Sequence, residues 1–149
     1  MSDDAFSQPS VDADLRAAVE AHFRAVVEGR VEAIIDRYAA SANTYVFAEG
    51  PRWSTIGHEA IAEGWRAYVN SLLSVRSIEW IEGPVGDRWA NAGWIGGIVE
   101  MAVEVGGEMS TVRFRSTHVM ERDDASTWQI VHEHLSRPDD DPYGTGDWL

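Results

Sequence analysis

The most chemically suggestive residues of this chain stand near its C-terminal end. His132, His134 and Ser136 alternate along one segment rich in β-forming residues. Alternate residues of a strand share one face, so Trp128 and Ile130 would lie on the same face as the two histidines. Since an aromatic and an aliphatic residue are typical of a buried face, we expect both imidazoles and the Ser136 hydroxyl to point inward.

An imidazole inside a cavity can act as a general base, a hydrogen-bond donor or a pH-sensitive binding group. We expect His134 to be the first candidate for catalysis and His132 the second. The alternative is that the pair is structural and satisfies buried backbone groups. In the expected orientation Glu133 is solvated or lies at a subunit interface. The opposite orientation would bring Glu133 and Leu135 inside, where a lone carboxylate would need a partner.

Metal and cofactor chemistry has little support in the composition. The chain has no cysteine and no lysine, which excludes thiolate nucleophiles, cysteine-ligated metals and Schiff bases. The His132 and His134 pair could bind zinc or iron only with a third ligand, and His118 is the one histidine expected nearby. We therefore expect no metal and no other cofactor.

Arg115 and several aromatic residues are candidate ligand contacts. A buried arginine is costly unless it is paired, so Arg115 either pairs with Glu100 or Glu104 or meets an anionic ligand. Large aromatic side chains could form the mouth of a site for a flat, apolar ligand, although such residues are often simply core. The candidate substrate-binding residues are Arg115, Ser136, Tyr45, Trp53, Trp65, Tyr68 and His118.

Three helices are expected to position these residues. Apolar residues at helical spacing, with His22 and Phe23 among them, predict a first helix between a cap at Ser10 or Asp12 and an end at Gly29. A second, shorter helix follows over 31–38, and a third opens near 57.

In the second half of the chain, apolar residues recur at every second position, which is the spacing of β-strands. Short strands are expected at 44–47, 77–82, 89–95, 99–105, 111–122 and 128–136, most of them separated by glycine-containing turns. Such short connections make an antiparallel meander. The predicted fold class is therefore α+β, with three N-terminal helices packed on a curved, mainly antiparallel sheet.

Length and charge restrict the domain organisation and the partners. A chain of 149 residues is the size of one domain, and its net charge of −13 is concentrated toward the two ends. We expect disordered acidic tails at 1–11 and 138–149 around a domain at 12–137. The negative charge argues against nucleic acid as a partner. No leader sequence or apolar run of membrane length is present, so we expect no membrane partner and a cytoplasmic location.

The last two predicted strands resemble a known family. Arg115 and Thr117 match an Arg-x-Thr strand, and the final strand matches the pattern Trp-x-Ile-Val-His-x-His-x-Ser. This sequence pattern resembles the C-terminal signature of the SnoaL-like branch of the NTF2-like superfamily. That superfamily includes ketosteroid isomerase-like proteins and the association domain of calcium/calmodulin-dependent kinase II. The resemblance implies an NTF2-like cone over roughly residues 12 to 137.

Two classes of function follow from the resemblance. One is a cofactor-independent isomerase, cyclase or dehydratase that acts by proton transfer on a cyclic or aromatic metabolite. The other is a non-catalytic module that self-associates or senses a ligand. Ketosteroid isomerase-like members carry a carboxylate base in a strand that resembles 43–51, whereas this chain has Tyr45, Val46 and Phe47 at its centre.

A homodimer through the outer face of the sheet is also expected. Val131 and Leu135 alternate with Gln129 and Glu133 on the face opposite the histidines, and this mixture is typical of subunit interfaces. Members of the superfamily that the chain resembles often dimerise through this surface.

Overall fold

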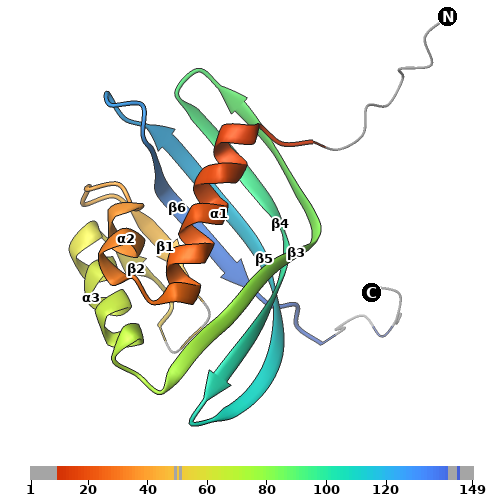
Figure 1. Ribbon diagram of the computed structural model, residues 1–149. Coiled ribbons are helices and arrows are strands. Elements are labelled where there is room, and N and C mark those ends of the chain that lie inside the picture. Colours follow the sequence, from red (N-terminus) through yellow and green to blue (C-terminus); the bar gives the residue numbers. More distant parts are fainter. Residues whose placement is uncertain (1–9, 49, 51, 141–143, 145–149) are drawn as a thin grey trace, which may run out of the picture.

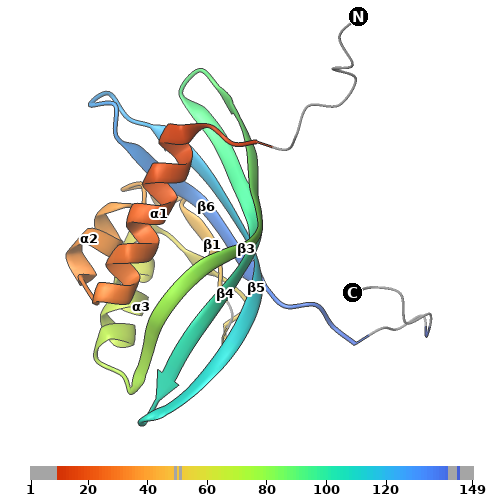
Figure 2. The ribbon, with the colours of Figure 1, turned by 45° about the vertical axis from the view of Figure 1, so that its right-hand side comes forward.

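Three helices cover one face of a six-stranded sheet in the computed structural model, which describes residues 10–48, 50, 52–140 and 144 (Figure 1). The sheet curves around the helices, and α1 lies across its inner face (Figure 2). The elements in chain order are α1 (Ala13–Glu28), α2 (Val31–Asp36), β1 (Tyr45–Phe47), β2 (Thr55–Ile56), α3 (His58–Val69), β3 (Leu73–Trp89), β4 (Ala92–Val105), β5 (Glu108–Arg122) and β6 (Trp128–Ser136).

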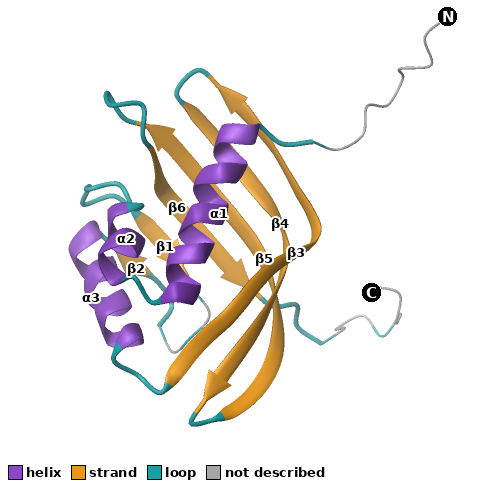
Figure 3. Ribbon diagram, viewed as in Figure 1, coloured by secondary structure: helices purple, strands orange, loops and turns teal. Residues whose placement is uncertain are grey.

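The sheet has the strand order β2-β1-β6-β5-β4-β3. All neighbouring strands are antiparallel except β1 and β6, which run parallel. The long strands β3, β4 and β5 form one side of the sheet, and the short strands lie at the other (Figure 3). The predicted fold class is confirmed: helices from the first half of the chain pack on a mainly antiparallel, curved sheet.

Helix α1 begins and ends where its sequence predicts. The Asp12 carboxylate accepts hydrogen bonds from the backbone N–H groups of Asp14 and Leu15 at 3.0 and 3.1 Å, which satisfies two free donors of the first turn. Gly29 ends the helix with a φ of 66°, a left-handed conformation that glycine adopts without strain. The apolar face between these caps packs into the core, and His22 lies on that face.

Strands β3 and β4 are longer than predicted. Glycine pairs were expected to separate short strands, but Gly96 and Gly97 lie inside β4, which is continuous from Ala92 to Val105. The reason is close backbone approach, since a Cβ atom on Gly97 would lie 2.4 Å from the carbonyl oxygen of Glu82. These glycines allow the sheet to bend where β3 and β4 meet.

Strand β6 contains a bulge that the sequence pattern does not reveal. Val119 of β5 pairs with His132, but the next residue, Met120, pairs with Ile130. Val131 is therefore an extra residue in β6. Beyond this bulge, each side chain points to the face of the sheet opposite to the one that simple alternation from Ile130 predicts. Ile130 faces the core as predicted, whereas His132 does not.

The predicted acidic tails lie mostly outside the described residues. The first helix starts at Ala13 and the last strand ends at Ser136, close to the predicted domain boundaries at 12 and 137. None of the helices in the described part of the chain has the length and apolar character needed to cross a membrane.

Candidate functional site

A cavity of about 560 Å³ lies between the helices and the inner face of the sheet. Its wall is almost entirely apolar, and its polar side chains are few. The lining residues on the helices are His22, Phe23, Val26, Trp65 and Tyr68, and those on the strands include Val75, Ile78, Met101, Val103, Val112, Phe114, Glu133 and Leu135. An apolar cavity of this size with a few convergent polar groups is typical of a small-molecule site.

Two charged residues line this cavity, the exposed Arg137 and the buried Glu133. The Glu133 side chain is only 3% exposed, and three side chains from three other parts of the chain face it. His118 Nε2 lies 2.7 Å from Glu133 Oε2, and the Tyr38 hydroxyl donates to Oε1 at 2.9 Å. His22 Nε2 lies 3.7 Å from Oε2. A buried carboxylate is stable only with such partners, so these four residues form one polar cluster.

The cluster fixes the protonation of its members. Burial alone would raise the pKa of Glu133, but its interactions with His118 and then His22 outweigh burial and hold this pKa well below the usual range. Burial lowers the pKa of His22 in spite of the nearby carboxylate. Burial and Glu133 together raise the pKa of Tyr38 well above its ordinary value. At neutral pH the cluster therefore holds an ionised Glu133, a neutral His22 and a protonated Tyr38.

The tautomer of His22 follows from these contacts. The single hydroxyl proton of Tyr38 is donated to Glu133, so both groups near His22 Nε2 act as acceptors: Tyr38 Oη at 3.4 Å and Glu133 Oε2 at 3.7 Å. We assign the ring proton to Nε2 for this reason. Nδ1 then carries a lone pair. His22 also lines the cavity, and its Nδ1 is a buried acceptor without a hydrogen-bond partner among the described residues.

Three of the predicted site residues lie on this inner side. Trp65 and Tyr68 are one turn apart on α3, and both line the cavity. Trp65 also packs against His22 with their ring centroids 6.0 Å apart. His118 is fully buried; it bonds Glu133 and packs against Phe23, and both of these residues line the cavity.

The other predicted residues lie elsewhere, and the predicted inward orientation of the C-terminal histidines is wrong. His132, His134 and Ser136 face the outer side of the sheet because the bulge at Val131 reverses the parity of β6. Glu133 and Leu135 take the inner positions instead, and Glu133 is neither solvated nor at the outer face. A catalytic role for His132 or His134 stays a prediction and would require a site on the outer face.

Arg115 lies on that outer face too, where it forms a hollow of about 350 Å³ with Thr117, His134 and Ser136. Arg115 Nε donates to the Ser136 hydroxyl at 3.2 Å. Its predicted pairing with Glu100 or Glu104 is not formed, because Glu100 binds Arg113 and Glu104 binds Arg76 instead.

The two remaining aromatic candidates do not line the cavity. Tyr45 is on the outer face, where its carbonyl oxygen accepts a hydrogen bond from His132 Nδ1 at 2.7 Å. Trp53 is 97% exposed. The alternative metal site is not formed either, since His118 and the outer histidines lie on opposite faces of the sheet.

Sequence reasoning did not identify His22, Tyr38 or Glu133 as site residues. The first two had a visible signal, because each is a polar residue on the apolar face of a predicted helix. For Glu133 the sequence offered one weaker indication: if the final strand faced the other way, this carboxylate would be buried and would need partners.

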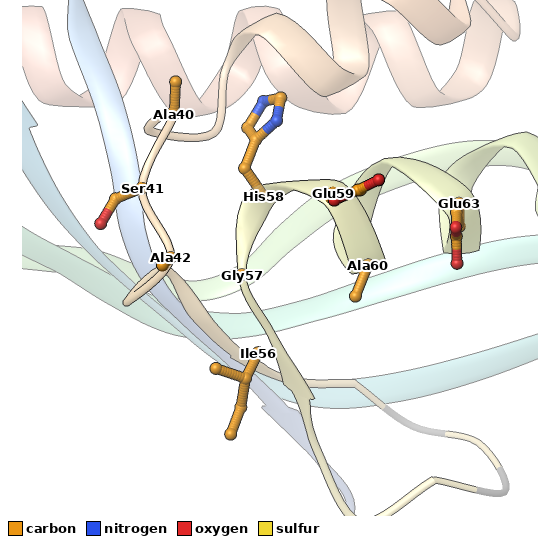
Figure 4. A pocket seen from close by; sticks show the side chains of 9 residues that line it. All are labelled: Ala40, Ser41, Ala42, Ile56, Gly57, His58, Glu59, Ala60 and Glu63. Atoms are coloured by element: carbon orange, nitrogen blue, oxygen red, sulfur yellow. The ribbon is translucent and has the colours of Figure 1, made fainter.

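A second hollow, of about 660 Å³, lies beside the start of α3 (Figure 4). Its polar side chains are those of Ser41, His58, Glu59 and Glu63, and they point in different directions rather than toward one point. None of them is buried. The hollow therefore lacks the convergent groups that distinguish the inner cavity.

Comparison with known proteins identifies the family. The model of the SnoaL-like domain matches residues 15–140. The chain belongs to the SnoaL-like domain family. The matched region contains the complete cavity and all four members of the Glu133 cluster. No curated protein shows significant sequence similarity to this SnoaL-like chain.

Solved structures share the fold of this SnoaL-like protein at low sequence identity. An NTF2-like superfamily protein from Salmonella enterica superposes with a TM-score of 0.75 at 17% identity, covering 89% of this chain and 94% of its own. A candidate calcium/calmodulin-dependent kinase II association domain from Xanthomonas campestris gives 0.73 at 14%, covering 91% and 98%. A ketosteroid isomerase-like protein from Erwinia carotovora gives 0.69 at 15%, covering 85% and 96%. At these identities the comparisons establish the fold alone.

Proposed function

We propose that this SnoaL-like protein binds a small cyclic or aromatic molecule in its inner cavity and moves a proton on it without a cofactor, with His22 as the base. The observation that carries the proposal is a buried imidazole, His22, in the wall of a mainly apolar cavity, with its Nδ1 unsatisfied among the described residues. A buried acceptor without a partner is costly, and a ligand that brings an acidic hydrogen to Nδ1 would remove that cost.

The chemistry follows from the Glu133 cluster. Nδ1 of His22 accepts a proton from a C–H bond next to a carbonyl group, and the electron pair of that bond passes into the carbonyl to form an enolate. The imidazolium that forms lies 3.7 Å from the ionised Glu133, which stabilises its positive charge. Return of the proton to a different carbon of the conjugated system gives an isomer and regenerates neutral His22. Glu133 is held ionised by His118 and Tyr38, so it acts by stabilising the charge of His22 rather than as the base.

The test uses 2-tetralone, a bicyclic apolar ketone with acidic hydrogens at C1. We expect the protein to bind it and to accelerate exchange of the C1 hydrogens with deuterium from D₂O, measured by proton NMR. A V112W variant fills the cavity from strand β5 and is expected to lose both binding and exchange. The matched control T111W places the same side chain on the exposed neighbouring residue and should retain both. Binding without exchange would contradict the catalytic part of the proposal, and equal behaviour of the two variants would contradict the assignment of the cavity.

A homodimer through the outer face of the sheet is the second part of the proposal. Consecutive cross-strand pairs place one row of side chains across four strands of that face. The row consists of Tyr45, His132, Val119 and Trp94. The next row consists of Phe47, His134, Thr117 and Gly96. Over these four strands neither row contains a carboxylate, although the chain has a net charge of −13 and Asp87 of β3 is the next cross-strand partner of Trp94. Two copies can therefore meet here without the repulsion that their net charge imposes elsewhere.

Light scattering is expected to give a mass of about twice 16.5 kDa at micromolar concentration. V119E places a charge in the middle of the first row and should reduce the mass to that of the monomer. R24E, on the exposed side of α1, reverses a charge on the opposite side of the molecule and should leave the dimer intact. A monomeric native protein, or a dimer that V119E does not affect, would overturn this assignment.

A further inference from the structure

The hollow on the outer face of the sheet lies on the opposite side from the inner cavity. Its volume is about 350 Å³, and two neighbouring strands supply its lining residues: Arg115 and Thr117 from β5, and His134 and Ser136 from β6. The cross-strand pairs of Arg115 with Ser136 and of Thr117 with His134 place these side chains in two adjacent rows. The partner of Thr117 on β4 is Gly96, which has no side chain to fill the space beside it.

Arg115 is held in place by the protein but has no carboxylate partner. Its Nε donates to the Ser136 hydroxyl at 3.2 Å, and its Nη2 donates to the backbone carbonyl oxygen of Arg137 at 2.8 Å. Both acceptors are uncharged, and among the residues that the structure describes no carboxylate lines the hollow. By contrast Arg113, two residues earlier on the same face, is paired with Glu100 at 2.7 Å. Within the described part of the chain, Arg115 therefore offers an unpaired positive charge in a defined orientation.

Two hydroxyl groups complete the set of donors. The Thr117 hydroxyl makes no hydrogen bond to the described residues, and the Ser136 hydroxyl accepts from Arg115, so each retains a proton that it can donate. The guanidinium protons of Arg115 that are not used in its two hydrogen bonds are donors as well. His134 forms the remaining wall, where its ring packs against Phe47 with the ring centroids 5.1 Å apart.

We propose that this hollow binds a phosphate group, either as the free ion or as part of a small phosphate monoester. The oxygens of a phosphate point in at least three directions, and one guanidinium and two hydroxyls supply a donor group for three of them. A carboxylate has two oxygens in one plane and matches these three groups less well. The net charge of −13 repels anions from the molecule as a whole, so binding depends on this local arrangement of donors.

The inference is independent of both parts of the proposed function. The donors lie outside the inner cavity, so proton transfer there is not involved. Thr117 and His134 also belong to the second row of the proposed dimer surface, but a single copy supplies every donor of the hollow. Phosphate binding is therefore expected in the native protein, whatever its oligomeric state.

The experiment is a titration of the native protein with inorganic phosphate at constant ionic strength. Calorimetry should give a dissociation constant of about 1 mM or lower, and NMR should show backbone amide shifts centred on residues 115–117 and 134–136. Acetate should bind at least about 10-fold more weakly. Arg115→Gln should weaken phosphate binding by at least about 10-fold, because it removes a charge-assisted donor. Arg24→Gln removes the same charge from the exposed side of α1, and this matched control should stay within about 2-fold of the native constant.

A second variant tests the hydroxyl contribution. Thr117→Val keeps the shape of the side chain and removes its donor, so phosphate binding should weaken by about 3- to 10-fold. This variant also decides the question if Arg115→Gln does not fold. Glycerol 3-phosphate separates the two sources of the phosphate group: tighter binding than inorganic phosphate indicates a monoester, and weaker binding indicates the free ion.

The opposite results are equally distinct. Absence of phosphate binding by the native protein, or amide shifts confined to other regions, would overturn the inference. Equal effects of Arg115→Gln and Arg24→Gln would do the same, as would acetate binding as tight as that of phosphate. None of these results affects deuterium exchange of 2-tetralone or the mass from light scattering, so the inference can fail while the proposed function stands, and the reverse.

Discussion

Replacing Glu133 with alanine is expected to lower the free energy of unfolding by about 3–5 kcal/mol, because removing one partner of a buried charged cluster leaves the others unpaired. His118 Nε2 and the Tyr38 hydroxyl lose their acceptor at 2.7 and 2.9 Å, and both side chains are fully buried. Urea denaturation followed by circular dichroism measures the change.

The matched control for this prediction is Glu121→Ala. Glu121 lies on the neighbouring strand β5, but its side chain is exposed, so the change should stay within about 0.5 kcal/mol. Glu133→Gln should fall between the two, since an amide keeps one acceptor oxygen and loses the charge. A loss of less than about 1 kcal/mol in Glu133→Ala would show that the polar cluster does not stabilise the fold.

The same cluster predicts that stability decreases in acid in two steps. The pKa values of His22 and Glu133 are lower in the folded protein than the ordinary values of 6.5 and 4.5. The unfolded chain therefore binds more protons than the folded one as the pH falls. The free energy of unfolding should keep its full contribution from both groups above pH 6.5. It should decrease below pH 6.5 as His22 is protonated, and decrease further below pH 4.5 as Glu133 is protonated. Each group contributes at most about 1.4 kcal/mol per pH unit. In Glu133→Ala the contribution of that carboxyl below pH 4.5 should disappear.

Replacing His22 with glutamine is expected to slow exchange of the 2-tetralone C1 hydrogens by about 10²- to 10⁴-fold, which is the usual contribution of a general base. Glutamine keeps a polar side chain of similar size but cannot accept the proton at neutral pH. The dissociation constant of 2-tetralone should change much less than the exchange rate, because the cavity wall is otherwise intact. NMR exchange and calorimetry on the same samples separate the two effects.

His134→Gln is the matched control for the base. It makes the same change on the outer face, so exchange should stay within about twofold of the native rate. The native rate should also fall as the pH drops through the lowered pKa of His22, and it should remain at its plateau at pH 7. The opposite result, loss of exchange in His134→Gln and retention in His22→Gln, would contradict this assignment. It would identify His134 as the base, as the sequence pattern predicts.

The sequence by itself determined the fold class and the positions of most elements. The caps of α1 at Asp12 and Gly29 act locally, and the apolar period between them identifies the face of α1 that packs into the core. The change to a period of two predicts the meander, and Trp65 and Tyr68 are on the predicted inner face of the third helix. These features depend on interactions between residues close in sequence, and therefore a single sequence reveals them.

The tertiary structure alone decided which residues meet in the cavity. One extra residue at Val131 exchanges the faces of His134 and Glu133, and a bulge is a property of strand pairing that no alternation pattern contains. The base is likewise defined by two long-range contacts: His22 is an ordinary residue of an apolar helix face until Tyr38 and Glu133 occupy the side of its ring that carries Nε2. Protonation and orientation at such a site depend on burial and on partners far apart in the chain, and only the folded arrangement supplies both.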